Sequence, residues 1–338
     1  MHHLRLGLRF IGVLCAAALI SACGATNAQA PTQDAEPTSS PTASKVNVVA
    51  TTSIIGDLAQ NVGGERVNVR VILPPGTDPH SYAPTPADVQ AISEAQLLLQ
   101  NGLGLEEWLE ELIANAGGTQ TTVVVSEGIT PLGGGDDEHG DDEHAAETAT
   151  TDEHSDDEHG HEGADPHMWF DVRNTIRYVE HIRDGLKGVD PAGAATYDEQ
   201  AAAYIKQLEA LDAEIIQLTE SVPAERRKLI TNHDTFGYFA ERYDYTIVGN
   251  VFSGVSTEQE PSAQQVAELV RLIREQNVAA VFTENTVNPR LAEQIAAEAG
   301  VDVVTTLYTD ALGEPGSEGD SYIKMMRYDV QQIVEALK

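Results

Sequence analysis

The stretch KVNVVATTSIIGDLAQNVGG (residues 45–64) sets a strand signal directly before a helix signal. Residues 46–50 form a short apolar run that predicts a buried strand, and residues 54–62 carry apolar side chains at helical spacing. The pair Gly63 and Gly64 then ends the helix. A strand followed at once by a helix is the repeating unit of a parallel α/β fold.

The same alternation continues through the rest of the chain, on both sides of a polar run at 136–162. Before that run, periodicity predicts strands at 67–73, 97–100 and 121–125 and helices at 86–95 and 105–114. After it come helices at 174–186 and 192–219. The remainder predicts strands at 228–231, 246–251, 279–282 and 301–306, alternating with helices at 236–243, 262–275, 289–299 and 321–337.

Strands that alternate with helices predict parallel sheets covered on both faces. We therefore expect an α/β protein with two Rossmann-like lobes joined by a long linking helix. The predicted N-terminal lobe covers residues 45–170, and the C-terminal lobe covers 222–338. A helical segment at 171–221, which includes the linking helix, lies between them.

The beginning of the chain has the features of an export signal. Arg5 and Arg9 precede an uncharged apolar run at 10–20, which is shorter than the roughly 20 residues that span a bilayer. The sequence ISAC that follows, ending at Cys23, is similar to a bacterial lipobox. We therefore expect residues 1–22 to be a lipoprotein signal peptide and Cys23 to be acylated. An ordinary cleavable signal with an incidental Cys23 is the alternative.

The next segment, residues 23–44, is dense in Ala, Thr, Pro and Ser and predicts a flexible tether. After removal of the signal peptide only Cys23 remains, so no internal disulfide can form and cysteine cannot supply a metal site in the folded part. The full chain has a net charge of −34. This balance argues against a nucleic-acid partner and suits a protein, expected to be a monomer, that handles cations.

The polar run at 136–162 contains 13 acidic residues, five histidines and no Lys or Arg. Such a composition predicts a disordered insertion in the N-terminal lobe. One interpretation is a solvated segment with no specific role. The other is a weak, multiple metal collector, because the acidic units supply oxygens and imidazoles without fixed geometry. Its histidines are His139, His144, His154, His159 and His161.

Outside this run, candidate ligands follow predicted strands. His80 follows the strand at 67–73, His233 follows the strand at 228–231, and Asp310 follows the strand at 301–306. In parallel sheets the binding site forms outside the carboxyl ends of the strands. His167 lies between the acidic run and a helix. Three imidazoles and one carboxylate would make a shell that suits zinc, although each residue alone is weak evidence, since a lone His is more often simply hydrogen-bonded.

Four segments strengthen this hypothesis: PPGTDPHSYAPTP (74–86), DPHMWFD (165–171), NHDTFGYF (232–239) and YTDAL (308–312). In sequence and order they resemble the ligand segments of the zinc/manganese substrate-binding lipoproteins of ABC importers. The resemblance extends from residue 46 to residue 337. It implies that one metal ion is held in the cleft between the lobes by His80, His167, His233 and Asp310.

The resemblance also implies a function and a location. A member of this family would not be an enzyme. It would be held outside the cytoplasm by a lipid anchor in the membrane and would pass its metal to the permease and ATPase of an importer. The alternatives are a metal-binding surface adhesin and a zinc hydrolase. The hydrolase is disfavoured because Asp310 would fill the position that catalytic zinc leaves open, and because the chain has no His-Glu-x-x-His motif.

The expected metal is Zn²⁺, with Mn²⁺ as the alternative. Manganese-selective members of the family tend to have Glu at the position of His233. The imidazole present here favours zinc, because manganese prefers shells richer in oxygen.

Overall fold

The computed structural model describes residues 44–338, except 118, 134–162, 253 and 259. The predicted signal peptide, the tether, Cys23 and the acidic run, with its five histidines, lie outside the described residues. In the part that is described, no helix is both long and apolar enough to cross a membrane.

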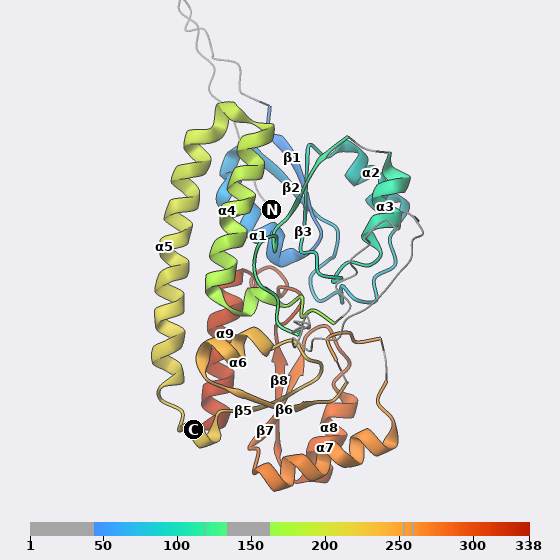
Figure 1. Cartoon of the computed structure of the whole chain (residues 1–338), viewed down its shortest axis with the longest axis vertical. Coiled ribbons are helices and arrows are strands. Elements are labelled where there is room, and N and C mark those ends of the chain that lie inside the picture. Colours follow the sequence, from blue (N-terminus) through green and yellow to red (C-terminus); the bar gives the residue numbers. More distant parts are fainter. Residues whose placement is uncertain (1–43, 118, 134–162, 253, 259) are drawn as a thin grey trace, which may run out of the picture. The chain divides into compact units, whose positions relative to one another are not determined.

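The N-terminal lobe is built on one parallel four-stranded sheet in the order β2-β1-β3-β4. Its helices α2 and α3 lie on one face, and α1 and α4 lie toward the other (Figure 1). The elements are β1 (Val46–Ala50), α1 (Ser53–Gly63), β2 (Val67–Val71), α2 (Pro86–Glu94), β3 (Leu97–Gln100), α3 (Leu109–Ala116), β4 (Thr121–Val124) and α4 (Val172–Val189).

Local chemistry accounts for the boundaries of these elements. The Thr52 side chain accepts a hydrogen bond from the Ile55 backbone N–H and caps the start of α1. The helix predicted at 105–114 begins only at Leu109. The reason is that the buried carboxylate of Glu106 accepts the backbone N–H groups of Asn101 and Gly102, which holds this stretch in a turn. The sequence prediction of the helix start was therefore wrong by one turn.

The C-terminal lobe is also built from parallel strands, as the sequence predicts. Its four strands form two parallel pairs, β5-β6 and β7-β8, and β5 also contacts β7. Helices α7 and α8 pack together under these pairs (Figure 1). The elements are β5 (Lys228–Thr231), α6 (Gly237–Tyr243), β6 (Thr246–Asn250), α7 (Ala263–Gln276), β7 (Ala280–Glu284), α8 (Arg290–Ala299), β8 (Asp302–Leu307) and α9 (Tyr322–Leu337).

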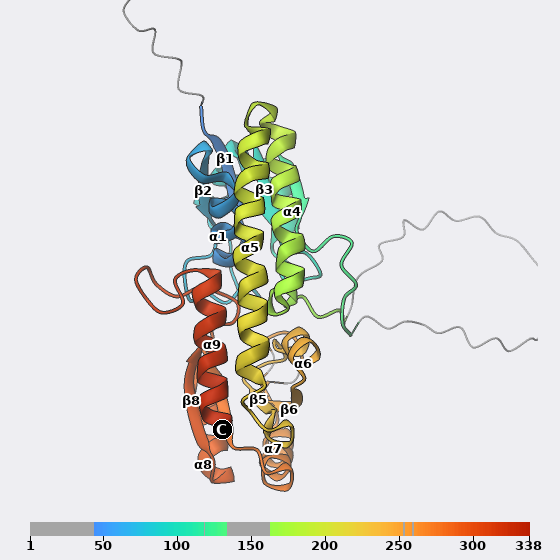
Figure 2. The same ribbon diagram turned by 90° about the vertical axis from the view of Figure 1, so that its left-hand side faces the viewer.

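The long helix α5 (Ala194–Thr219) links the lobes, as the sequence predicts. It contacts α1 and α4 in the N-terminal lobe and α6 and α9 in the C-terminal lobe, and Figure 2 shows it running beside α4 and α9. Its buried residues follow a three-and-four spacing, which gives one continuous apolar stripe. They are Tyr197, Ala201, Tyr204, Leu208, Leu211, Ile215 and Thr219.

The stripe on α5 joins the two lobes into one core. A single apolar cluster runs from Val46 in β1 through Leu208 to Phe282 in β7 and Leu337 in α9. Each lobe has only a smaller cluster of its own, beneath α2 and α3 or beneath α7 and α8. The lobes are therefore packed on a shared helix, and the ligand segments between them are held from both sides.

Candidate metal centre

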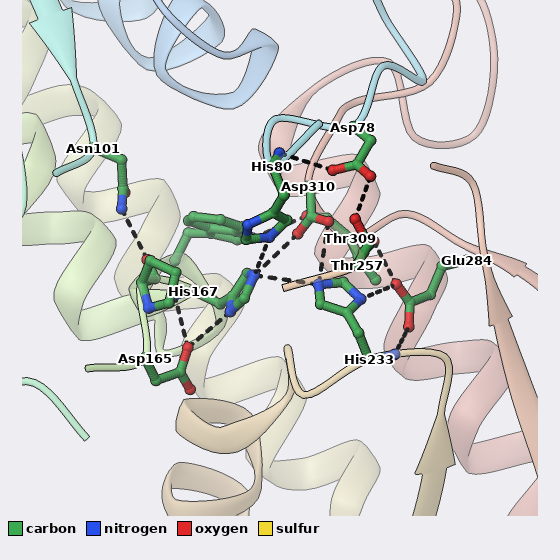
Figure 3. Close-up of polar contacts among 12 residues, drawn as sticks. Asp78, His80, Asn101, Asp165, His167, His233, Thr257, Glu284, Thr309 and Asp310 are labelled. Atoms are coloured by element: carbon green, nitrogen blue, oxygen red, sulfur yellow. Dashed lines mark hydrogen bonds and ion pairs between the residues drawn. The ribbon is translucent and has the colours of Figure 1, made fainter. Parts of the chain in front are cut away.

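The structure brings together the four side chains predicted as ligands. One ligand atom from each of His80, His167, His233 and Asp310 lies within 4.8 Å of those of the others. They come from both lobes: His80 follows β2, His233 follows β5 and Asp310 follows β8 (Figure 3). Three of the four segments leave the carboxyl ends of parallel strands, which is where such sheets bind ligands.

His167 lies at the start of a short 3₁₀ turn (Met168–Phe170) and is fully buried. Asp165 makes two contacts with His167: its Oδ1 accepts the His167 backbone N–H at 2.9 Å and also lies 2.8 Å from the ring Nδ1. The amide of Asn101, just past β3, donates to the Pro166 carbonyl at 2.9 Å. The His167 segment is therefore also fixed by the carboxyl end of a strand, although no predicted strand directly precedes it.

His233 is fixed by Glu284, the last residue of β7. Glu284 Oε1 accepts the His233 backbone N–H at 3.0 Å, and Oε2 lies 2.6 Å from the ring Nδ1. The same Oε2 accepts the hydroxyl of Thr309 at 3.2 Å. One buried carboxylate thus orients a histidine and the residue next to Asp310. A carboxylate on Nδ1 leaves Nε2 as the free ligand atom and makes the imidazole a stronger donor.

His80 is the least buried of the four residues, whereas the exposed fractions of the others are 0–1%. Its backbone N–H donates to Asp78 Oδ1 at 2.9 Å, and the indole of Trp108 donates to the Pro79 carbonyl at 2.9 Å. These contacts hold the backbone of the turn. Among the described residues, no hydrogen bond joins a carboxylate to the His80 ring.

The ligand atoms face one another. The Nε2 of His167 lies 3.3 Å from the Nε2 of both His80 and His233. The two oxygens of Asp310 lie 3.5 Å from His167 Nε2 and 3.3 Å from His233 Nε2. Neither oxygen accepts a hydrogen bond within the described residues, although both are buried. A buried carboxylate without hydrogen bonds is costly unless a cation compensates its charge.

The pKa values follow from this burial. Burial, together with the neighbouring imidazoles, lowers the pKa of His80 to about 3, and burial holds the pKa of His167 well below its usual range. Burial alone would lower the pKa of His233, but Glu284 and Asp310 outweigh it and raise this pKa to about 10. Burial raises the pKa of Asp310 to about 7. Two neutral imidazoles thus offer their lone pairs, and the third carries a proton that a metal ion would displace.

The prediction from the sequence did not include the residues that support the candidate ligands. Glu284 had a signal, since it is an acidic residue at the end of a strongly apolar strand. Asp78 and Asp165 also had one, because the same Asp-Pro-His triplet occurs twice. Asn101 and Thr309 carried no signal in the sequence. Asn101 acts on Pro166, which is 65 residues away, and Thr309 acts on Glu284, which is 25 residues away.

The chain is similar to several known metal-binding proteins. Residues 48–336 match the family model described as zinc-uptake complex component A, periplasmic. The manganese-binding lipoprotein MntA of Halalkalibacterium halodurans is 35% identical over 292 residues, which cover 86% of this chain and 88% of that protein. The iron-binding protein YfeA of Yersinia pestis is 33% identical over 302 residues, 89% of each chain. The solved structure of the periplasmic zinc-binding protein TroA from Treponema pallidum matches with a TM-score of 0.75 and 30% identity, covering 87% of this chain and 99% of that one.

Proposed function

Because the chain belongs to the periplasmic zinc-uptake component A family, whose members are metal-binding components of ABC importers and not enzymes, we propose that it captures Zn²⁺ for import. In this proposal His80, His167, His233 and Asp310 are the four ligands. The metal ion is cargo, held until the protein meets the permease and ATPase of its importer.

The spacing of the ligand atoms carries the choice of zinc. Donors about 2.0–2.1 Å from a zinc ion at the corners of a tetrahedron lie about 3.3–3.4 Å from one another. The two Nε2 to Nε2 separations are 3.3 Å, and the two contacts from Asp310 are 3.3 and 3.5 Å. The two Asp310 contacts come from different oxygens, Oδ1 to His167 and Oδ2 to His233, so this spacing supports three nitrogens and one carboxylate around a small ion such as zinc.

Manganese is the alternative within the same function, since MntA is a manganese-binding relative. An Mn²⁺ ion prefers oxygen donors and more than four ligands. Asp310 could supply a second oxygen, but the other three donors are imidazoles that suit zinc better. We therefore expect zinc to bind at least about tenfold more tightly than manganese.

The test is metal analysis of the full chain purified without chelator, followed by competition between Zn²⁺ and Mn²⁺. His233→Glu replaces a nitrogen donor with a carboxylate and should narrow the gap between the two affinities. Equal affinities of the unchanged protein for the two metals would overturn the choice of zinc. If the purified protein binds neither Zn²⁺ nor Mn²⁺ in a stoichiometric amount, the proposed site is overturned.

The location is part of the proposal. The relative MntA is a lipoprotein by name, and the ISAC sequence ending at Cys23 supports a lipid anchor that keeps this chain outside the cytoplasm. Labelled fatty acid should appear on the protein and disappear in Cys23→Ala. A mature N-terminus at Ala25 or later in unlabelled protein would exclude the anchor.

For the acidic run we propose weak collection of zinc by its five histidines. Deleting residues 136–162 should remove several weak sites and leave the tight site and the thermal stability of the metal-free protein unchanged. The four proposed ligands of the tight site all lie outside the deleted residues. Loss of the tight site in the deletion variant would place primary ligands in the run and contradict this division.

A further inference from the structure

The triplet Asp-Pro-His occurs twice in the ligand segments, as Asp78-Pro79-His80 and Asp165-Pro166-His167. Both copies form the same backbone turn. In each, the Oδ1 of the aspartate accepts the backbone N–H of the histidine at 2.9 Å. The local sequence thus specifies the same turn at both places, and any difference between the copies comes from their surroundings.

The remaining contacts of the two aspartates differ (Figure 3). Asp165 Oδ1 also lies 2.8 Å from the Nδ1 of its own histidine. Asp78 instead directs its Oδ2 away from the His80 ring. This oxygen accepts the hydroxyl of Ser81 at 3.2 Å and the hydroxyl of Thr257 at 2.5 Å. The bond from Thr257 ends on a carboxylate, and hydrogen bonds to a charged acceptor are stronger than those between neutral groups.

This bond crosses from one lobe to the other. Asp78 lies between β2 and α2 in the N-terminal lobe, whereas Thr257 lies between β6 and α7 in the C-terminal lobe, 179 residues later. It is made two residues from His80, the most exposed of the four candidate ligands. The other three are enclosed by the protein, so solvent reaches the site from the side of His80.

We propose that Thr257 is a positioning residue for metal retention: by donating to Asp78 across the two lobes, it holds the His80 turn against the C-terminal lobe and slows metal release. This inference rests on the proposed function. A bound ion leaves by exchanging its protein ligands for water one at a time, and the ligand nearest solvent on the least supported turn is exchanged first. His167 and His233 each have a carboxylate on the ring, whereas His80 depends on its backbone turn and on this bond.

The contact makes a specific kinetic prediction. Thr257→Val keeps the shape of the side chain and removes only the hydroxyl, and Thr257→Ser keeps the hydroxyl. The full chain is loaded with one equivalent of Zn²⁺ and mixed rapidly with an excess of a chromogenic chelator, and the rates of release and of capture are measured. Thr257→Val should release zinc about threefold faster with little change in the capture rate, whereas Thr257→Ser should stay near the unchanged protein.

Two control variants test whether the contact between lobes is responsible. Ser256→Ala removes a hydroxyl from the same segment. Within the part of the chain that the structure describes, this hydroxyl accepts only the backbone N–H of Glu258. Ser81→Ala removes the other hydroxyl on Asp78 Oδ2 but leaves the bond to Thr257 in place. Both variants should release zinc at the unchanged rate.

Normal release from Thr257→Val overturns the inference, and so does fast release from Thr257→Ser or from Ser256→Ala. The outcomes also separate it from the proposed function. If the unchanged chain takes up no zinc, the proposed function fails. If all variants bind zinc tightly and release it at one rate, only the role of Thr257 fails.

Discussion

The Asp165-Pro166-His167 turn lies inside the core, whereas the Asp78-Pro79-His80 turn lies at its edge. In the first turn, the Asn101 amide donates a hydrogen bond to the Pro166 carbonyl, and the Tyr238 hydroxyl donates one to the Asp165 carbonyl. In the second turn, the Trp108 indole donates to the Pro79 carbonyl, and the Thr257 hydroxyl donates to the Asp78 carboxylate. One triplet therefore makes a fixed ligand in one place and a more exposed ligand in the other. Under the proposed function, we expect the enclosed turn to hold the metal ion and the exposed turn to be where its release begins.

The largest expected difference between the two turns is in the ligands themselves. His167→Ala should lower the zinc affinity by more than about 100-fold, and His80→Ala by only about tenfold, because water can replace the exposed ligand more easily than the enclosed one. Competition against a chelator of known affinity measures both values. Circular dichroism of the metal-free variants checks that each has folded. Equal losses would show that the two turns do not differ in function.

The aspartates should differ in the same direction. Asp165→Asn removes the charge beside the His167 ring and should lower the zinc affinity by about 10- to 100-fold. Asp78→Asn still offers an oxygen to the His80 backbone N–H, so its loss should be about threefold. The same chelator competition distinguishes the two results. A larger loss for Asp78→Asn would mean that this carboxylate acts on the metal directly.

Above about pH 7.5 the pH dependence should come from neither turn, because burial raises the pKa of Asp165, the carboxyl group beside His167, only to about 7. His80, with a pKa of about 3, is neutral near pH 8, and the pKa of His167 is also far below that range. His233 has its pKa raised to about 10, so the metal-free protein keeps this proton near pH 8, and zinc must displace it. Zinc affinity should therefore rise about tenfold from about pH 7.5 to about pH 8.5, which corresponds to one proton.

The range is chosen so that Asp310, with its pKa raised to about 7, has already lost its proton. Isothermal titration in two buffers of different ionisation heat counts the protons released on binding. A count near zero would mean that His233 is neutral before the metal arrives. A count well above one would mean that the histidines of the two turns titrate as well.

The smallest expected effect concerns the two tryptophans that support the ligand segments. Trp169 donates to the Thr309 carbonyl at 3.0 Å in the core, and the half-buried Trp108 donates to the Pro79 carbonyl. Trp169→Phe leaves a buried carbonyl unpaired and should lower the free energy of unfolding by about 1–3 kcal/mol, whereas Trp108→Phe should lower it by about 0.5–1 kcal/mol. Urea unfolding of the metal-free protein measures both. A larger loss of stability in Trp108→Phe than in Trp169→Phe would mean that the exposed His80 turn is supported more strongly than the segment in the core.

Much of the fold was predictable because its signals are local. The strand at 46–50 and the helix at 192–219 were recognised from periodicity within a few residues of their observed ends. The grouping of His80, His233 and Asp310 followed from the rule that places sites after parallel strands. The pairing of the C-terminal strands and the core shared through α5 were not predictable, since both depend on how whole elements pack.

The sequence by itself determined the order of strands and helices, the residue types of the candidate shell and the two identical Asp-Pro-His turns, because each depends on neighbours along the chain. Only the tertiary structure decided which acidic group supports which histidine. Glu284 meets His233 across 51 residues, and Thr257 meets Asp78 across 179. Such contacts are fixed by the packing of the two lobes on α5, and that packing gives the same triplet two different environments.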